Sequence, residues 1–305
     1  MLVDPEGEVL LSVPARKIRR VVVHGNVGLT TPAMTFLLKR GAEVVYLSTG
    51  GQIYGVASPS PLPSPARIEK QMAVARGERG LVIAKAIVNA KARSQIRYLQ
   101  RQGLGTEAVE PLLELLGFLE RAGDLDAVRG VEGGVSRLYF QLLGEVHPGL
   151  GFERRLRRPP RDPVNAALSY AYAILLAVCQ SALVGAALHP EIGVLHATGR
   201  RRPSLALDLM EEFRVAVVDV PVVAAFLRGR LDRRAVELRD GGVFLDERGR
   251  RSVIELMEKR LASRASGAAT TYLELIHRQA ERLGSAIVHG KAYQPYVFGE
   301  GVKGG

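Results

Sequence analysis

The pattern of apolar residues changes across one proline-rich segment, SPSPLPSPA at residues 58–66. Proline fixes φ and lacks a backbone N–H, so its four prolines cannot continue a strand or a helix. Such a composition is typical of a stiff linker. We therefore place a domain boundary there and predict two domains, residues 1–64 and residues 65–305.

Before this segment, short β-branched or apolar runs bounded by Gly, Pro or Ser predict strands. These runs are GEVLLSV, IRRVVVHG, AEVVYLST and GQIYGVAS. A helix is expected between the second and the third, because Thr31 can cap it, Pro32 suits its first turn and Gly41 suits its exit. The first domain is therefore predicted to be small and β-rich.

After the segment, apolar residues recur at helical spacing almost to the end of the chain, with one hairpin-like insertion, VELRDGGVFLDERGRR. The longest apolar stretch, residues 166–188, is interrupted by polar residues and glycine, which favours a buried core helix over a membrane span. It contains the only cysteine, Cys179, which we expect to be a buried thiol. The predicted fold class is α+β, with a small β-rich domain followed by a larger all-α domain.

The formal net charge is +11, which favours a polyanionic partner, because Lys and Arg release counterions from phosphates. Nucleic acid is the first candidate for this partner. An anionic membrane surface is the weaker candidate, since no basic amphipathic anchor stands out. The start of the chain lacks the pattern of a signal peptide, so we expect a cytoplasmic protein that does not bind membranes.

Acidic residues gather on one predicted helix, SLALDLMEEFR, which begins at Ser204. Helical spacing places Asp208, Glu211 and Glu212 on the face opposite its apolar residues. His196 precedes them by a short loop, and carboxylates with one imidazole suit Mg²⁺ or Mn²⁺. The alternative is a solvated acidic face with His196 in an ordinary turn, and the spacing alone favours that alternative.

Glu132 is a weaker candidate, within RGVEGGVSRLYF. Gly133 and Gly134 follow it, and each costs about 1 kcal/mol inside a helix relative to alanine. Either a close backbone approach or a break in the helix would explain them.

Arginines gather in two segments that suit phosphate contacts. The first segment precedes a predicted helix on which Asn165 and Tyr170 are further candidates for DNA contact. A basic surface over core tyrosines is the alternative for the first segment, and a plain surface loop for the second. The candidate arginines are Arg154, Arg155, Arg157, Arg158, Arg161, Arg200, Arg201 and Arg202.

Together these motifs resemble the CRISPR-associated integrase-nuclease of the adaptation step, which inserts new spacers into the repeat array. The matching stretches occur in order along the chain, so the resemblance covers nearly all of it. They are HGNVGLTTPAMTFLLKRGAEVVYLS, EGGVSRLYF, RRPPRDPVNAALSYAYAIL, EIGVLH, SLALDLMEEFR and YQPYVF. One departure is the Gly-Gly pair after Glu132, where the commoner pattern has small residues such as alanine.

The resemblance implies an N-terminal domain that helps to form a homodimer and an all-α catalytic domain. It implies a Mg²⁺ or Mn²⁺ ion on Glu132, His196 and Glu211, with Asp208 as the alternative third ligand. It also implies a small ferredoxin-like partner subunit and a reaction in which a DNA 3′-hydroxyl attacks a phosphodiester of the repeat. Two competing interpretations stay open, a non-catalytic basic DNA-binding scaffold and a structure-specific repair nuclease.

Overall fold

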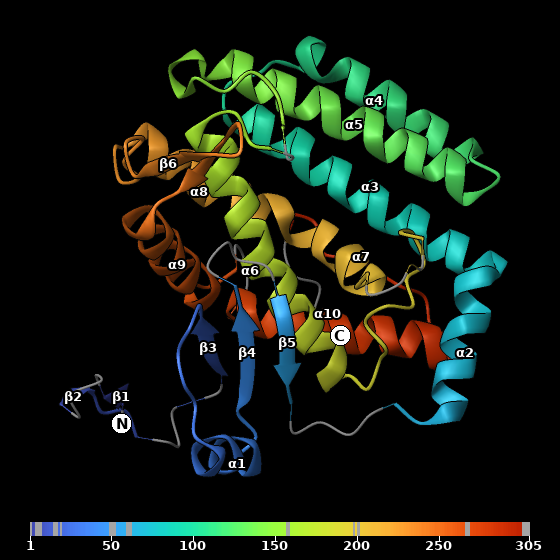
Figure 1. Cartoon of the computed structure of the whole chain (residues 1–305). Helices are drawn as coiled ribbons and strands as arrows, with labels where there is room; N and C mark the ends of the chain where they lie inside the picture. The colour runs from blue at the N-terminus through green and yellow to red at the C-terminus, as the bar shows by residue number, and fades with distance from the viewer. Residues whose placement is uncertain are drawn as a thin grey trace. The chain divides into compact units, whose positions relative to one another are not determined.

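The chain forms two compact units, Met1–Pro61 and Leu62–Gly305 (Figure 1). This computed structural model describes residues 2–3, 8–14, 18, 20–48, 53–58, 63–156, 159–197, 199, 202–265 and 269–300. The division lies next to the boundary that the prolines predicted, although Pro59 and Pro61 fall outside the described residues.

The N-terminal unit contains five short strands and one helix among its described residues. They are β1 (Leu2–Val3), β2 (Val9–Leu11), β3 (Arg20–His24), α1 (Thr31–Lys39), β4 (Glu43–Leu47) and β5 (Ile53–Ala57). Strand β4 is central in a three-stranded sheet, parallel to β3 and antiparallel to β5. The parallel pair requires a crossover, which α1 supplies. The small β-rich domain is confirmed.

Helix α1 begins and ends close to the predicted residues. Its N-cap is Thr30, one residue earlier than predicted, and the Thr30 side chain accepts a hydrogen bond from the Ala33 N–H. Gly41 has φ of 78° after the last turn, a conformation that glycine adopts without strain. Leu37 packs beside Val23 and Val44 in a small core of this unit.

The second unit is helical apart from one hairpin, as predicted. Its elements are α2 (Pro65–Arg76), α3 (Glu78–Arg101), α4 (Thr106–Arg121), α5 (Leu125–Val146), the short 3-10 helix η2 (Pro148–Leu150), α6 (Pro163–Gly185), α7 (Ser204–Phe213), the π-helix η3 (Arg214–Asp219), α8 (Val220–Leu227), β6 (Val236–Arg239), β7 (Gly242–Leu245), α9 (Glu247–Ala262) and α10 (Tyr272–His289). Helices α3, α4 and α5 lie side by side, and α3 also packs against α7 (Figure 1). This fold is α+β, so the predicted fold class is confirmed.

Helix α6 is the central helix of this unit. It is long and apolar enough to cross a membrane, but most of it is buried against α7, α9 and α10. Cys179 lies within it as a buried free thiol, as predicted. The burial explains why this helix is apolar on all sides.

Helix α5 continues without a break through Gly133 and Gly134. A Cβ at Gly133 would meet no atom within 4 Å, and one at Gly134 would make ordinary contact, 3.5 Å, with Leu115. The break in the helix is therefore wrong, and within this chain no close backbone approach requires either glycine. Glu132 therefore projects from a regular helix.

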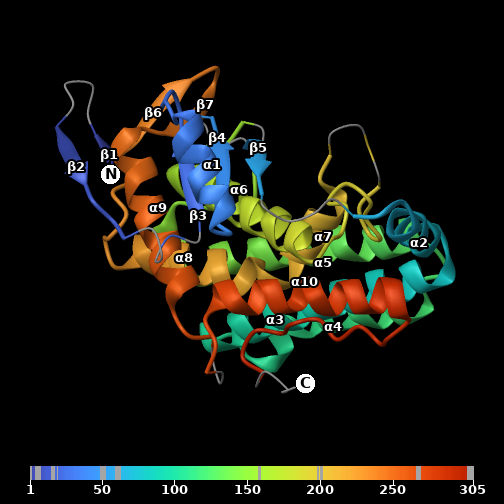
Figure 2. The ribbon, with the colours of Figure 1, turned by 90° about the horizontal axis from the view of Figure 1, so that it is seen from below.

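The C-terminal segment after α10 runs back along α10 and α3 (Figure 2). The Phe298 N–H donates to Ser94 Oγ at 3.0 Å, and Gln279 Nε2 donates to the Gln294 carbonyl at 3.0 Å. This segment includes the YQPYVF motif. These contacts tie the end of the chain to α10 and to α3.

Candidate metal centre

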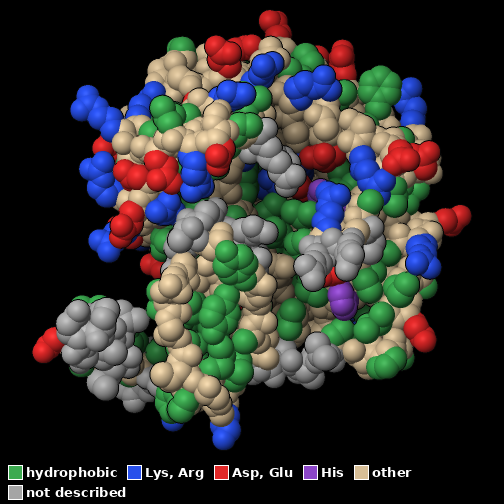
Figure 3. Space-filling view, in the orientation of Figure 1, with side chains coloured by type: hydrophobic (Ala, Val, Ile, Leu, Met, Phe, Trp, Pro, Cys, Tyr) green, Lys and Arg blue, Asp and Glu red, His purple; other side chains and the backbone are tan. Residues whose placement is uncertain are grey.

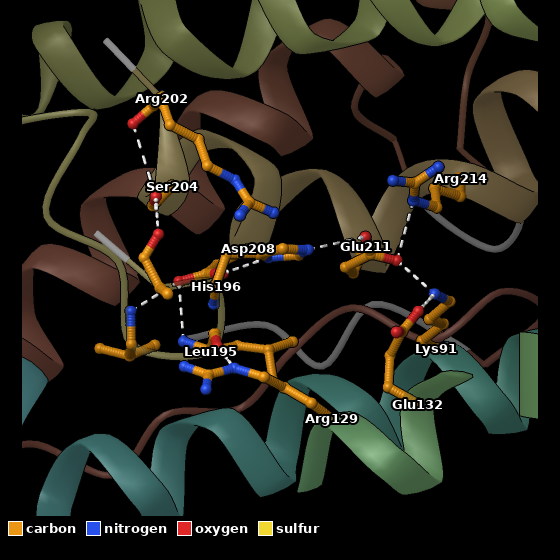
Figure 4. Close-up of polar contacts among 12 residues, drawn as sticks. Lys91, Arg129, Glu132, Leu195, His196, Arg202, Ser204, Asp208, Glu211 and Arg214 are labelled. Carbon is orange, nitrogen blue, oxygen red and sulfur yellow. Dashed lines mark hydrogen bonds and ion pairs between the residues drawn. The ribbon is translucent and has the colours of Figure 1, made fainter. Parts of the chain in front are cut away.

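Four separate segments bring the candidate residues together in the helical unit (Figure 4). Helix α5 contributes Glu132, helix α7 contributes Asp208 and Glu211, and the loop before α7 contributes His196. Helix α3 contributes Lys91, which the sequence analysis did not consider. The three distant carboxylate and imidazole groups of the prediction therefore lie in one place.

The acidic face of α7 is buried. Asp208 and Glu212 are fully buried and Glu211 is 2% exposed, so the alternative of a solvated face is wrong. Ionised carboxylates are rarely buried unless they are paired. Each of these three acids accordingly has its own set of partners, described below.

Asp208 holds the loop that carries His196. Its Oδ2 accepts the backbone N–H groups of Val194 and Leu195 at 2.6 and 3.0 Å. Its Oδ1 accepts the His196 N–H at 2.9 Å and lies 2.7 Å from His196 Nδ1. Both carboxylate oxygens of Asp208 are thus engaged by the loop.

The close packing of this loop requires Gly193. A Cβ there would lie 2.7 Å from Ser204 Cβ, 2.9 Å from Asp208 Oδ2 and 2.9 Å from the His196 carbonyl. Arg129 supports the loop from α5, since its Nε donates to the Leu195 carbonyl at 2.7 Å. The EIGVLH motif therefore contains residues that the packing of this loop requires, in addition to His196.

The bond to Asp208 orients the imidazole of His196. A carboxylate only accepts hydrogen bonds, so the proton of the neutral ring sits on Nδ1. Nε2 then carries the free lone pair, and it lies 4.0 Å from Glu211 Oε1. The side chain is 19% exposed, so the ring is reached from solvent. This arrangement leaves one nitrogen available to a metal ion.

Lys91 lies between the other two carboxylates. Its Nζ pairs with Glu132 Oε1 and, at 2.6 Å, with Glu211 Oε2. Ser136 Oγ donates to the same Glu132 oxygen at 2.9 Å. Arg214, from the π-helix η3, places its Nε 2.8 Å from Glu211 Oε2 and lies over the Tyr172 ring at 4.5 Å. Two buried cations therefore neutralise this acidic pair.

These neighbours decide the charge of both glutamates. Burial alone raises the pKa of Glu211, but Arg214 and Lys91 hold it well below its ordinary value. Burial likewise raises the pKa of Glu132, whereas Lys91 lowers it and the net direction is downward. Both side chains are therefore anionic at neutral pH, as metal ligands must be.

A divalent metal fits this donor set. Two anionic carboxylates and an imidazole with a free nitrogen suit Mg²⁺ or Mn²⁺, and a cationic group already stands between the carboxylates. Within the described part of the chain, no three His, Cys, Asp or Glu side chains form a ready-made metal cluster. Lys91 lies between the two carboxylates of this set.

Glu212 points away from this centre, which corrects the expectation that it shares a face with Asp208 and Glu211. Its carboxylate accepts hydrogen bonds from the Tyr293 hydroxyl, from Gln279 Nε2 at 2.9 Å and from the Tyr296 N–H at 2.7 Å. It therefore anchors the C-terminal segment.

Burial raises the pKa of Glu212 to about 7, although its hydrogen bonds lower it in part. The folded protein therefore gains stability from this group below about pH 4.5 and loses it as the pH rises through 7. We expect the free energy of unfolding of Glu212→Gln to fall less steeply between pH 5 and pH 8 than that of the wild type. Urea denaturation across this range measures the slope, and Glu107→Gln at an exposed position controls for the charge. An unchanged slope in Glu212→Gln would contradict this role.

The predicted DNA-contacting residues divide into exposed and structural ones. Asn165 is fully buried, and its amide holds the Arg154 carbonyl, the Leu156 N–H and the Arg155 guanidinium. Tyr170 is 5% exposed. The expectation that Asn165 and Tyr170 contact DNA is therefore corrected, because both side chains are packed in the interior.

Arg155 is also largely structural, since it donates to Asn165 Oδ1 at 2.7 Å and to Ser169 Oγ at 2.9 Å. Arg154, Arg161 and Arg202 are exposed, whereas Arg157, Arg158, Arg200 and Arg201 lie outside the described residues. Lys and Arg side chains are spread over the helical unit and interspersed with acidic ones on the face seen in Figure 3. For the exposed arginines, phosphate binding stays a prediction.

Sequence reasoning missed Lys91, Arg214 and Asp219. Asp219 is fully buried and accepts hydrogen bonds from Tyr172 and, at 2.9 Å, from Tyr139. Asp219 and Arg214 belong to the π-helix η3, a rare conformation that often occurs at functional sites. In the sequence, Arg214 and Asp219 could have been noticed as charged residues in an otherwise apolar helical stretch.

Comparison with known proteins identifies the family. Residues 1–259 match the family described as CRISPR associated protein Cas1. The CRISPR-associated endonuclease Cas1 1 of Thermus thermophilus is 46% identical over 301 residues, which cover 98% of this chain and 94% of that protein. A match of this extent includes both units.

Solved structures share the fold. TM1797, a CAS1 protein from Thermotoga maritima, superposes with a TM-score of 0.82 over 99% of this chain and 94% of that one, at 23% identity. A casposase bound to an integration product gives a TM-score of 0.78 over 90% and 80% of the two chains, at 22% identity. From its sequence and its fold alike, the chain belongs to the Cas1 family of CRISPR-associated proteins, as its ordered motifs predicted.

Proposed function

We propose that this protein is a metal-dependent DNA endonuclease and strand-transferring integrase that inserts new spacer DNA into a CRISPR repeat array. One observation carries the proposal: Glu132 and Glu211 meet at a single cationic nitrogen, and the free nitrogen of His196 lies 4.0 Å from Glu211 Oε1. Stability alone is a weak explanation for such a buried set of charges, because well-packed apolar residues often stabilise a fold as well or better.

Glu132, His196 and Glu211 would hold the metal ion. When bound, Mg²⁺ or Mn²⁺ would polarise the scissile phosphate and stabilise the oxygen that leaves it. The attacking group is the 3′-hydroxyl of the incoming DNA, so one phosphodiester forms as another breaks. The carboxylates and the imidazole fix the position at which the phosphate is engaged.

Asp208 is better suited to position His196 than to bind the metal, because its oxygens already accept four hydrogen bonds from the loop. We therefore prefer Glu211 as the third ligand. Asp208→Asn replaces one of these oxygens by an NH₂ group that faces N–H donors. We expect metal affinity, measured by calorimetry, and the strand-joining rate to fall about 10- to 100-fold, as for other groups that orient a ligand histidine. A wild-type metal affinity in Asp208→Asn would contradict this role.

DNA and a second copy of the chain are the partners we propose. The exposed arginines Arg154, Arg161 and Arg202 would hold phosphates without reading sequence. The N-terminal unit would form the homodimer, and a small ferredoxin-like subunit would bridge two dimers on the DNA. The protein would work in the cytoplasm, where the repeat array lies.

The relatives support this activity. The Thermus thermophilus relative is named an endonuclease, and the casposase of the same fold is bound to an integration product. Cleavage and joining of strands are both transfers of a phosphoryl group between oxygens. One metal site can therefore perform either, depending on whether water or a 3′-hydroxyl attacks.

A strand-joining assay tests the proposal. Purified protein is incubated with a labelled short duplex and a supercoiled plasmid that carries a repeat, in Mg²⁺, in Mn²⁺ and with EDTA. We expect label to become covalently attached to the plasmid only with metal. Nicked plasmid without attached label would indicate a repair nuclease instead. DNA binding with neither product would indicate a non-catalytic scaffold.

A further inference from the structure

Lys91 is a buried lysine in the candidate centre, with 2% of its side chain exposed. Lysine is almost never buried in this way unless its charge is paired. The ammonium group is paired twice, with Glu132 from α5 and with Glu211 from α7. It therefore joins the two helices that supply the carboxylates.

The same two carboxylates are the ones that would bind the metal, so this inference rests on the proposed function. A divalent ion held by Glu132 and Glu211 would stand within contact distance of the Lys91 ammonium. Two cations at such a separation repel one another strongly away from bulk water. The ammonium and the metal cannot both occupy the space between the carboxylates.

We infer that Lys91 is an internal counterion that fills the metal position in the metal-free protein and must leave it when the metal binds. By competing for the same oxygens, it sets the affinity of the centre for metal. The flexible four-carbon stem of lysine allows the ammonium to move away without moving helix α3. Lys91 is thus a positioning residue that acts through the ligands.

Arg214 is less suited to this role. It contacts Glu211 from the π-helix and its guanidinium stacks over Tyr172, so it is held on two sides. No ion pair joins it to Glu132 among the described contacts, whereas Lys91 touches both carboxylates. Arg214 can keep the charge of Glu211 balanced whether or not the metal is present.

Removing the ammonium tests this competition. Lys91→Met largely keeps the aliphatic side chain and removes its charge. Glu132 and Glu211 then lose the cation with which both are paired. We expect Lys91→Met to bind Mn²⁺ at least tenfold more tightly than the wild type in isothermal titration calorimetry. Its melting temperature should be lower than that of the wild type without metal and should rise more when Mn²⁺ is added.

Two variants serve as controls. Lys91→Arg keeps a cation at the same place, and we expect its Mn²⁺ affinity to stay close to that of the wild type. Lys85→Met removes another lysine of α3, whose Nζ donates to the Glu120 carbonyl at 3.0 Å, and should change neither affinity nor the melting response. Lys91→Gln replaces Lys91→Met if the methionine variant does not fold.

Equal or weaker Mn²⁺ binding by Lys91→Met would overturn the inference, because Lys91 would then support the ligands rather than compete for them. The proposed metal centre is tested separately by Glu211→Gln and His196→Ala. If those two variants bind Mn²⁺ as the wild type does, the ion lies elsewhere and the proposed function fails. If they lose Mn²⁺ and Lys91→Met gains nothing, only the role of Lys91 fails.

Discussion

His196→Ala is expected to abolish strand joining while the protein stays folded and still binds DNA. In the proposed centre the imidazole would supply the one neutral ligand, and its loss would weaken the hold on a metal that would stabilise the transition state by several kcal/mol. A loss of about 4 kcal/mol slows a reaction roughly a thousandfold. The side chain is partly exposed and, among the described residues, hydrogen-bonds to Asp208, so little packing is lost. The joining assay and a melting curve measure the two effects.

His277→Ala is the matched control, because it removes a histidine of the same unit that is not among the candidate ligands. DNA affinity should match the wild type in His196→Ala, since we propose that arginines hold the phosphates. Strand joining by His196→Ala at more than about a tenth of the wild-type rate would contradict the assignment of His196 as a metal ligand.

Glu211→Ala is expected to cost stability as well as activity, which separates it from His196→Ala. Glu211 is the partner of two buried cations, Lys91 and Arg214. Removing one member of a buried ion pair leaves the other charge uncompensated and costs about 3–5 kcal/mol. We expect the free energy of unfolding to fall by that amount in chemical denaturation without metal. The isosteric Glu211→Gln should lose less stability than Glu211→Ala, and its strand-joining rate should be no higher than that of Glu211→Ala.

Glu258→Ala, at an exposed position of α9, controls for the loss of a glutamate from a helix and should change stability by less than about 0.5 kcal/mol. A similarly small change in Glu211→Ala would show that the Lys91 and Arg214 contacts do not stabilise the metal-free protein.

Much of the fold was predictable from local patterns. The proline-rich segment marked the change from strands to helices, and Pro32 with Gly41 delimited α1 closely. The hairpin-like insertion VELRDGGVFLDERGRR was predicted, and it forms β6 and β7. These signals are local, so they can be interpreted without knowledge of the tertiary structure.

The site was predictable only in part. Spacing on α7 related Asp208, Glu211 and Glu212, but it could not show that all three are buried or that Glu212 turns toward the C-terminal segment. Burial depends on which helices pack on α7, and that is not a local property. Lys91 was missed because the sequence of α3 contains many basic residues, and only packing against α5 and α7 makes this one a buried counterion.

The interpretation of the arginine-rich segment was wrong in part, at Arg155, Asn165 and Tyr170, for a related reason. Charge density predicted a phosphate-binding surface, but Arg155 turns inward and Asn165 closes the segment with its amide group. A dense run of arginines thus contains both surface residues and residues that build the loop. Sequence alone does not separate them.

The central claim is that Glu132, His196 and Glu211 converge on a single divalent ion. A crystal structure of the full chain grown with Mn²⁺, with anomalous data collected near the manganese absorption edge, tests it directly. We predict one anomalous peak within bonding distance of those three side chains, with Asp208 still on the His196 loop and the Lys91 ammonium displaced. A peak elsewhere in the helical unit, or Lys91 still between both carboxylates beside no ion at saturating Mn²⁺, would contradict it.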